Sequence, residues 1–146
     1  MIQENNRELL MKEICARIPY RTWFKFSYTE PYGHKAYSKS IIEGVSFPYY
    51  IEHYTLTGCE RLHIEISEIQ LYLFPLSSIT PEQEKELQEL GIGYGEYGFH
   101  DDIYGRGIMV DEAYEFYEWC YKNHIDFRGL IEKGLAIDAT GLGIYD

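Results

Sequence analysis

The sequence predicts an α+β fold in which a small, bent, antiparallel β-sheet of about four or five strands packs against an N-terminal helix and C-terminal helices. Three observations support this fold class. Apolar residues recur at helical spacing near both ends of the chain. Between them, short alternating segments are separated by turn residues, which is typical of antiparallel strands. The 146 residues fit one domain, 1–146, large enough to form a core without disulfides.

The first helix is expected over residues 6–18. Asn5 can cap its start, and Pro19 ends it. One stripe at helical spacing is apolar and should face the core: Leu10, Met11, Ile14, Cys15 and Ile18.

A half-buried strand is expected over residues 22–28, with Phe24, Phe26 and Tyr28 on one face. Turn residues follow at 31–34, and residues 35–40 are polar enough to form a loop that leads into Ile41. We therefore expect a hairpin here.

Two further strands, 49–57 and 62–66, flank a turn that contains Cys59 and should pair with each other. The apolar parity then changes from positions 62, 64 and 66 to positions 69, 71 and 73. This change predicts a bulge or a bend at Ser67 and Glu68.

A surface helix should start at Thr80, because Thr80 as N-cap, Pro81 at the first helical position and Gln83 form a capping box. It should end at Gly91. The glycine-rich residues 91–107 that follow are expected to form a long loop or an irregular hairpin, which is often a functional segment.

The third helix should be capped by Asp111 and buried on more than one side, because Phe116 and Trp119 widen its apolar stripe. That stripe contains Val110, Ala113, Tyr114, Tyr117, Tyr121 and His124. A last short helix over residues 128–133 should be closed by Gly134, and residues 140–143 should form a loose tail.

Composition disfavours several functions. The formal net charge is −11 and no run of Lys or Arg occurs, so direct nucleic-acid binding is not expected. Three widely spaced cysteines predict neither a disulfide framework nor a thiolate zinc site. The N-terminus has no apolar signal core and no segment approaches the ~20 apolar residues of a membrane span, so we expect a cytoplasmic protein without membrane contact.

Two groups of residues could carry chemistry. His100, Asp101 and Asp102 place a base beside two carboxylates, which could bind a divalent metal or move a proton if a third group converged. The sequence supplies no such third group, and adjacent carboxylates in a glycine-rich loop are usually solvated turn residues.

The second group, His124, Asp126 and Arg128, lies at a helix end. An imidazolium is favoured there by the helix dipole, and Asp126 can cap the next helix while it pairs with Arg128. In a catalytic interpretation Asp126 would orient His124 as a base, with Cys120 one turn away, but no nucleophile or oxyanion donor can be assigned.

Two other patterns are rejected. The string GYGEYG at 93–98 matches GxGxxG, yet it follows a helix rather than a strand and no helix opens at its end. His53, Cys59 and His63 match no established zinc spacing and lack a fourth ligand. We therefore expect no metal and no cofactor.

Two segments, LYLFPLSSITPEQ at 71–83 and HIDFRGLIEKGLA at 124–136, resemble a family of small proteins of unknown function encoded by phages and mobile elements of gut bacteria. The resemblance extends over about residues 13–136 and implies a phage or mobile-element protein that acts in a bacterial host cell. It implies no activity. The chain departs from the family pattern at Phe127, where tyrosine is common, and in its glycine-rich 91–107 segment.

The sequence favours a binding protein over an enzyme. Fifteen tyrosines without a catalytic constellation indicate protein–protein interaction through a tyrosine-rich, acidic surface, with Tyr94, Tyr97 and Tyr104 as contact residues and a host or phage protein as partner. One alternative is a small hydrolase or nucleotide-acting enzyme that uses one of the His/Asp groups. Another is an acidic mimic of nucleic acid that inhibits a host defence protein. The oligomeric state is left open.

Overall fold

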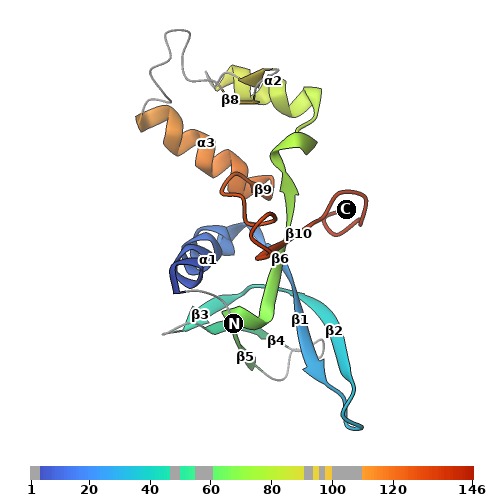
Figure 1. Ribbon diagram of the computed structural model, residues 1–146. Coiled ribbons are helices and arrows are strands. Elements are labelled where there is room, and N and C mark those ends of the chain that lie inside the picture. Colours follow the sequence, from blue (N-terminus) through green and yellow to red (C-terminus); the bar gives the residue numbers. More distant parts are fainter. Residues whose placement is uncertain (1–3, 47–49, 55–60, 91–93, 96–97, 100–109) are drawn as a thin grey trace.

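The computed structural model describes residues 4–46, 50–54, 61–90, 94–95, 98–99 and 110–146 (Figure 1). The predicted α+β class is confirmed, with one helix near each end of the chain and a mixed sheet between them. The main sheet contains, in spatial order, β10 (Ala136–Asp138), β6 (Ile69–Pro75), β1 (Trp23–Thr29) and β2 (Lys35–Ile41), and β9 (Ile125–Asp126) also pairs with β6. A second sheet contains, in order, β3 (Gly44–Ser46), β4 (Tyr50–Tyr54) and β5 (Arg61–Glu65). In addition, β7 (Tyr94–Gly95) pairs with β8 (Gly98–Phe99).

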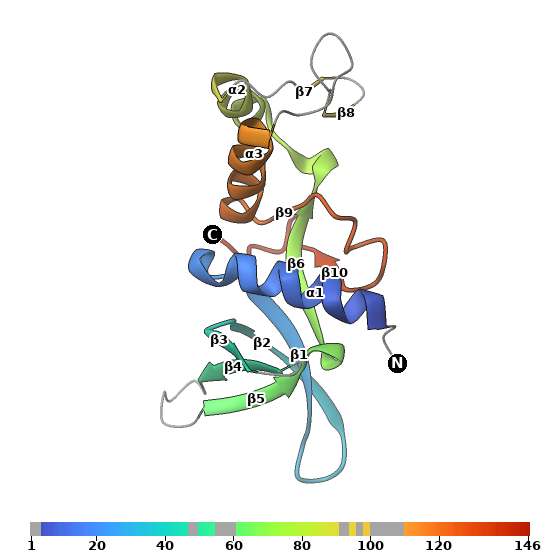
Figure 2. The same ribbon diagram turned by 90° about the vertical axis from the view of Figure 1, so that its left-hand side faces the viewer.

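The first helix, α1 (Glu4–Arg17), lies across β6 and β1 in Figure 2 and continues into a 3-10 turn at Ile18–Tyr20. Leu10 and Ile14 are fully buried, as the apolar stripe predicts. The prediction for Cys15 is wrong, because this side chain is exposed. Glu13 and Arg17 are buried instead, so α1 presents a charged pair to the interior beside its apolar stripe.

The predicted hairpin is confirmed, but its second arm is a strand rather than the expected loop. β1 (Trp23–Thr29) and β2 (Lys35–Ile41) pair antiparallel along their full length. The polar sequence of β2 is tolerated because this strand forms the edge of the main sheet and most of its side chains reach solvent. Both views show the far end of the hairpin projecting beyond the rest of the molecule (Figures 1 and 2).

The predicted pairing of the next strands is also confirmed, between β4 (Tyr50–Tyr54) and β5 (Arg61–Glu65), with β3 (Gly44–Ser46) on the other side of β4. The predicted bend is the 3-10 turn at Ile66–Glu68, which Glu65 caps by accepting a hydrogen bond from the Ser67 N–H. After this bend the chain leaves the small sheet and continues as β6 (Ile69–Pro75) in the main sheet.

The helix α2 (Pro81–Glu89) begins as predicted, since Thr80 and Gln83 form both hydrogen bonds of the capping box. Its buried Leu87 belongs to a second apolar cluster with residues of α3 (Val110–Lys122), among them Phe116, Trp119 and Cys120. The helix α3 starts at Val110, one residue before the predicted cap.

The C-terminal segment differs from the prediction. Residues 128–133 form turns rather than a helix, although Gly134 closes them with a φ of +75°, as expected. The short strands β9 (Ile125–Asp126) and β10 (Ala136–Asp138) pair parallel with β6 and were not predicted. The tail is not loose either, because Tyr145 donates a hydrogen bond of 2.6 Å to the Tyr72 carbonyl.

Candidate functional site

The predicted His124 group lies where α3 ends and β9 begins. His124 adopts a left-handed backbone conformation, with φ +59°, and its ring stacks on Tyr145 with 3.7 Å between the centroids. Its Nδ1 lies 3.4 Å from the Thr22 hydroxyl. Burial, assisted by the positive charge of Arg17, lowers the His124 pKa to about 4. The imidazole is therefore neutral at neutral pH, and the expectation of an imidazolium stabilised by the helix dipole is wrong.

Asp126 caps the turns that follow it, as predicted. Its two carboxylate oxygens accept hydrogen bonds from the backbone N–H groups of Leu130 (2.8 Å) and Ile131 (2.9 Å). The predicted pair between Asp126 and Arg128 is not formed, because Arg128 donates to Glu13 over 3.2 Å. Asp126 thus acts on the backbone and does not orient His124.

A buried ion-pair network joins α1 to the chain after α3. Glu13 is 1% exposed and Arg17 is fully buried. One carboxylate oxygen of Glu13 accepts from Nε and Nη2 of Arg17 (3.2 and 2.9 Å), and the other accepts from Arg128. Arg17 Nη2 also donates to the Ile125 carbonyl over 2.8 Å, and the Tyr121 ring lies 5.0 Å from the guanidinium carbon.

Sequence reasoning missed this network although a signal was present. Glu13 and Arg17 are spaced i, i+4, which we attribute by default to an exposed face of a helix. Only the position of the chain after α3 buries them, and no local pattern encodes that position.

The contacts of His124, Asp126 and Arg128 in the described structure are to other segments of the fold. Burial raises the pKa of the Cys120 thiol far above its ordinary value, so this group stays protonated at neutral pH. His124 faces Thr22 and Tyr145 instead of an ionised nucleophile. The observed contacts account for every member of the group as a link between elements.

The remaining predicted site residues lie outside the described residues. This holds for His100, Asp101, Asp102, Tyr97 and Tyr104. It also holds for Cys59 of the rejected zinc group and for the side chains of Tyr94, His53 and His63. Within the described ranges, no cluster of three or more His, Cys, Asp or Glu side chains could hold a metal ion. These predictions remain predictions.

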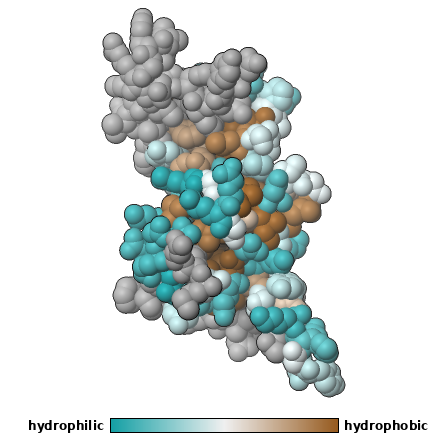
Figure 3. Space-filling view, in the orientation of Figure 1, coloured by the Kyte–Doolittle hydropathy of each residue, from teal (hydrophilic) through white to brown (hydrophobic). Residues whose placement is uncertain are grey.

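An exposed aromatic surface occurs on the projecting hairpin. Tyr32 in the turn is 89% exposed, Tyr37 on β2 is 62% exposed and Tyr28 on β1 is 46% exposed. We call these three tyrosines the hairpin surface. In Figure 3 the projecting end of the molecule is hydrophilic or of intermediate hydropathy, whereas apolar residues gather over its middle.

The strand register places three lysines on one face of this hairpin. Lys25 and Lys39 are directly opposite each other. Lys35 lies opposite Thr29, and because Thr29 is four positions from Lys25 on β1, Lys35 lies on the same face of the hairpin. The amine of Lys25 lies 4.3 Å from the centre of the Tyr37 ring, and that of Lys39 lies 5.4 Å from the centre of the Trp23 ring. We call Lys25, Lys35 and Lys39 the lysine face. None of them forms an ion pair with a carboxylate of the described residues.

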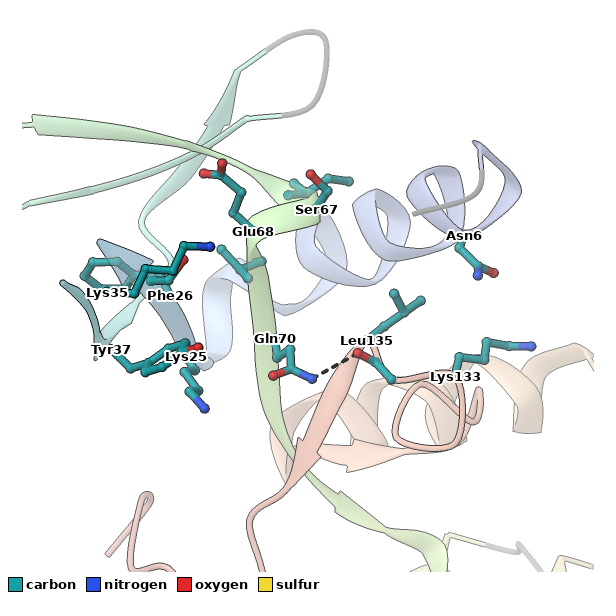
Figure 4. Close-up of a pocket in the computed structure, with 14 residues that line it drawn as sticks. Asn6, Lys25, Phe26, Lys35, Tyr37, Ser67, Glu68, Gln70, Lys133 and Leu135 are labelled. Carbon is teal, nitrogen blue, oxygen red and sulfur yellow. Dashed lines mark hydrogen bonds between the residues drawn. The ribbon is translucent and has the colours of Figure 1, made fainter. Parts of the chain in front are cut away.

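A pocket of about 620 Å³ opens beside the lysine face, where β6 separates from β1 (Figure 4). In the figure Lys25 and Lys35 extend from the hairpin side, Lys133 comes from the opposite side, and Gln70 lies between them. Gln70 donates a hydrogen bond of 3.0 Å to the Gly134 carbonyl, which joins the two sides. The other lining residues are Asn6, Phe26, Ser27, Tyr37, Ile66, Ser67, Glu68, Ile69, Gly134 and Leu135.

No family model, no curated protein and no solved structure matches this chain significantly. Among the described residues, no helix has the length and apolar character needed to cross a membrane.

Proposed function

We propose that this protein works by binding another protein, and that the hairpin surface is a contact region. The supporting observation is the concentration of exposed rings on one projecting element: Tyr28, Tyr32 and Tyr37. Tyrosine is enriched in protein interfaces because its ring supplies a large contact area at a low cost in conformational entropy and its hydroxyl can form hydrogen bonds. A hairpin that stands away from the body can enter a partner's surface without rearrangement of the core.

The charge of the hairpin specifies the partner further. The chain as a whole carries a net charge of −11, but β1, β2 and their connection contain three lysines and one glutamate, Glu30. The partner should therefore present a negatively charged surface to the hairpin, because opposite charges accelerate association and disfavour wrong partners. The resemblance to proteins of phages and mobile elements suggests a partner from a bacterial host or a phage, met in the cytoplasm.

The predicted tyrosines at 94, 97 and 104 belong to the same proposal as a second contact region. They lie in the glycine-rich segment, which is acidic where the hairpin is basic. Two contact regions of opposite charge would bind different partners or different parts of one partner.

The test compares variants in one binding assay. The protein is used to capture partners from bacterial lysate, and the affinity for a captured protein is then measured with purified components. Replacing Tyr32 and Tyr37 by alanine should weaken binding by about tenfold or more, because interface tyrosines often contribute 2 kcal/mol or more. Leu142→Ala is the matched control, since Leu142 is 53% exposed in the C-terminal turns, away from the hairpin. Equal affinity of the tyrosine variant and the wild type for every captured protein would refute the hairpin as a contact region.

A further inference from the structure

The lysine face is an energetic anomaly in this molecule. Acidic residues outnumber basic residues by 24 to 13, so carboxylates are abundant. Lys25 and Lys39 are nevertheless paired directly across two strands, an arrangement in which like charges repel and destabilise the sheet. The described carboxylates do not neutralise them, and two of the three amines instead lie against aromatic rings. Among the residues that the structure describes, no ion pair therefore compensates the positive charge of this face.

The adjoining pocket has the dimensions and the lining of a ligand site. Its volume of about 620 Å³ falls within the range of small-molecule pockets, roughly 300–1,000 Å³. Its lining combines apolar side chains with three lysines and a single carboxylate, that of Glu68. Lys133 adds a cation from a segment distant in sequence, so the positive charge is assembled by the fold and not by one strand.

Polar groups in the pocket add directional contacts. Because Gln70 uses its amide N–H₂ on the Gly134 carbonyl, its orientation is fixed and its oxygen remains available as an acceptor. Asn6 and Ser27 place an amide and a hydroxyl on two other walls. A ligand that carries both negative charge and hydroxyl groups matches this set of donors and acceptors.

We propose that this pocket binds a small organic anion with two or more phosphate or carboxylate groups. Lys25 and Lys35 bind its charged groups from the hairpin side, which Tyr37 also lines. Lys133, whose amine points away from Gln70 in Figure 4, turns toward the ligand from the opposite side through its flexible stem. Phosphate and carboxylate share the chemistry of a multivalent oxyanion, and the two are distinguished by experiment. This site shares Lys25, Lys35 and Tyr37 with the hairpin, but its ligand is a small molecule and its binding is measured without a protein partner.

The experiment measures binding of pyrophosphate and of citrate to the full chain by isothermal titration calorimetry at low and high salt, about 20 and 200 mM. We expect saturable binding of at least one probe at millimolar or lower concentration, weakened at high salt. A preference for pyrophosphate assigns a phosphate ligand, and a preference for citrate assigns a carboxylate ligand.

Variants locate the site. In the double variant Lys25→Gln and Lys35→Gln the affinity should fall about tenfold or more, since two charge-assisted contacts are lost. Lys85→Gln on α2, an exposed lysine outside the pocket, should bind as the wild type does. The proposal is overturned if neither probe binds saturably up to about 10 mM, a concentration well above the Kd of a specific small-molecule site. It is also overturned if the double variant binds as tightly as the wild type. Both outcomes leave the tyrosine test of the hairpin unaffected.

Discussion

Replacing Glu13 by glutamine should destabilise the fold strongly although no apolar contact is removed. Glu13 is the counterion of Arg17, whose guanidinium is fully buried, and the substitution leaves that charge uncompensated inside the protein. Breaking a buried pair at one partner typically costs about 3–5 kcal/mol. Glutamine retains one acceptor oxygen for Arg17, so we expect a loss of about 3 kcal/mol, a large share of the 5–15 kcal/mol of a typical domain.

The assay is urea unfolding followed by tryptophan fluorescence. With an m-value of about 1–3 kcal/mol per molar urea, the loss should move the unfolding midpoint down by about 1–3 M. Two variants test the reasoning. Arg128→Gln removes the half-exposed partner of Glu13 and should cost less than about 1 kcal/mol. Replacing Glu13 by leucine together with Arg17 by methionine should recover part of the loss, because the buried charge of this pair is gone. The Ile125 carbonyl then loses its donor and the half-exposed Arg128 loses its acceptor. A Glu13→Gln variant within about 0.5 kcal/mol of the wild type would refute the assigned role of this pair, because surface substitutions commonly have effects of that size.

Three further predictions concern single groups. Acidification from pH 6.5 to pH 4 should lower the free energy of unfolding, because His124 takes up a proton near pH 6.5 in the unfolded chain and only near pH 4 in the folded one. Allowing for the partial exposure of His124, the expected loss is about 1–2 kcal/mol. The variant His124→Asn should reduce this pH dependence in urea titrations. Asp126→Ala should cost about 2–3 kcal/mol in the same assay because two backbone N–H groups lose their acceptor, whereas an unchanged unfolding midpoint would contradict the cap. In a Cys59→Ser background, iodoacetamide should label Cys15 in the native protein and Cys120 only in urea, as read by mass spectrometry, and rapid native labelling of Cys120 would contradict its burial.

The sequence predicted the elements that local chemistry determines. The capping box at Thr80, the bend at Ser67 and the pairing of β4 with β5 depend on residues near one another in the chain, and all three are confirmed. The errors occur where distant segments decide. β2 looks like a loop because its residues are polar, and it becomes a strand because β1 supplies seven consecutive pairing partners.

The same reason limits prediction of the site. The residues at 124, 126 and 128 were recognised as a group, but their partners Thr22, Tyr145 and Glu13 come from other parts of the chain. The sequence does not indicate the lysine face, since Lys25 and Lys39 are fourteen positions apart and oppose each other only in the hairpin register. A search for pairs of like charges across a predicted hairpin would have found it.

Protection of the sheet edge offers another physical explanation for the lysines. Edge strands often carry lysine because a charged edge resists pairing with other chains. This accounts for Lys35 and Lys39, which lie on the edge strand β2. It does not account for Lys25, which lies on β1 between β2 and β6, or for Lys133, which lies in a turn across the pocket. Edge protection predicts that Lys39→Gln increases aggregation without changing the affinity for pyrophosphate or citrate, whereas an anion site predicts that Lys25→Gln lowers this affinity without promoting aggregation. Because the two lysines face each other across one strand pair, this comparison separates the two roles at a single position in the sheet.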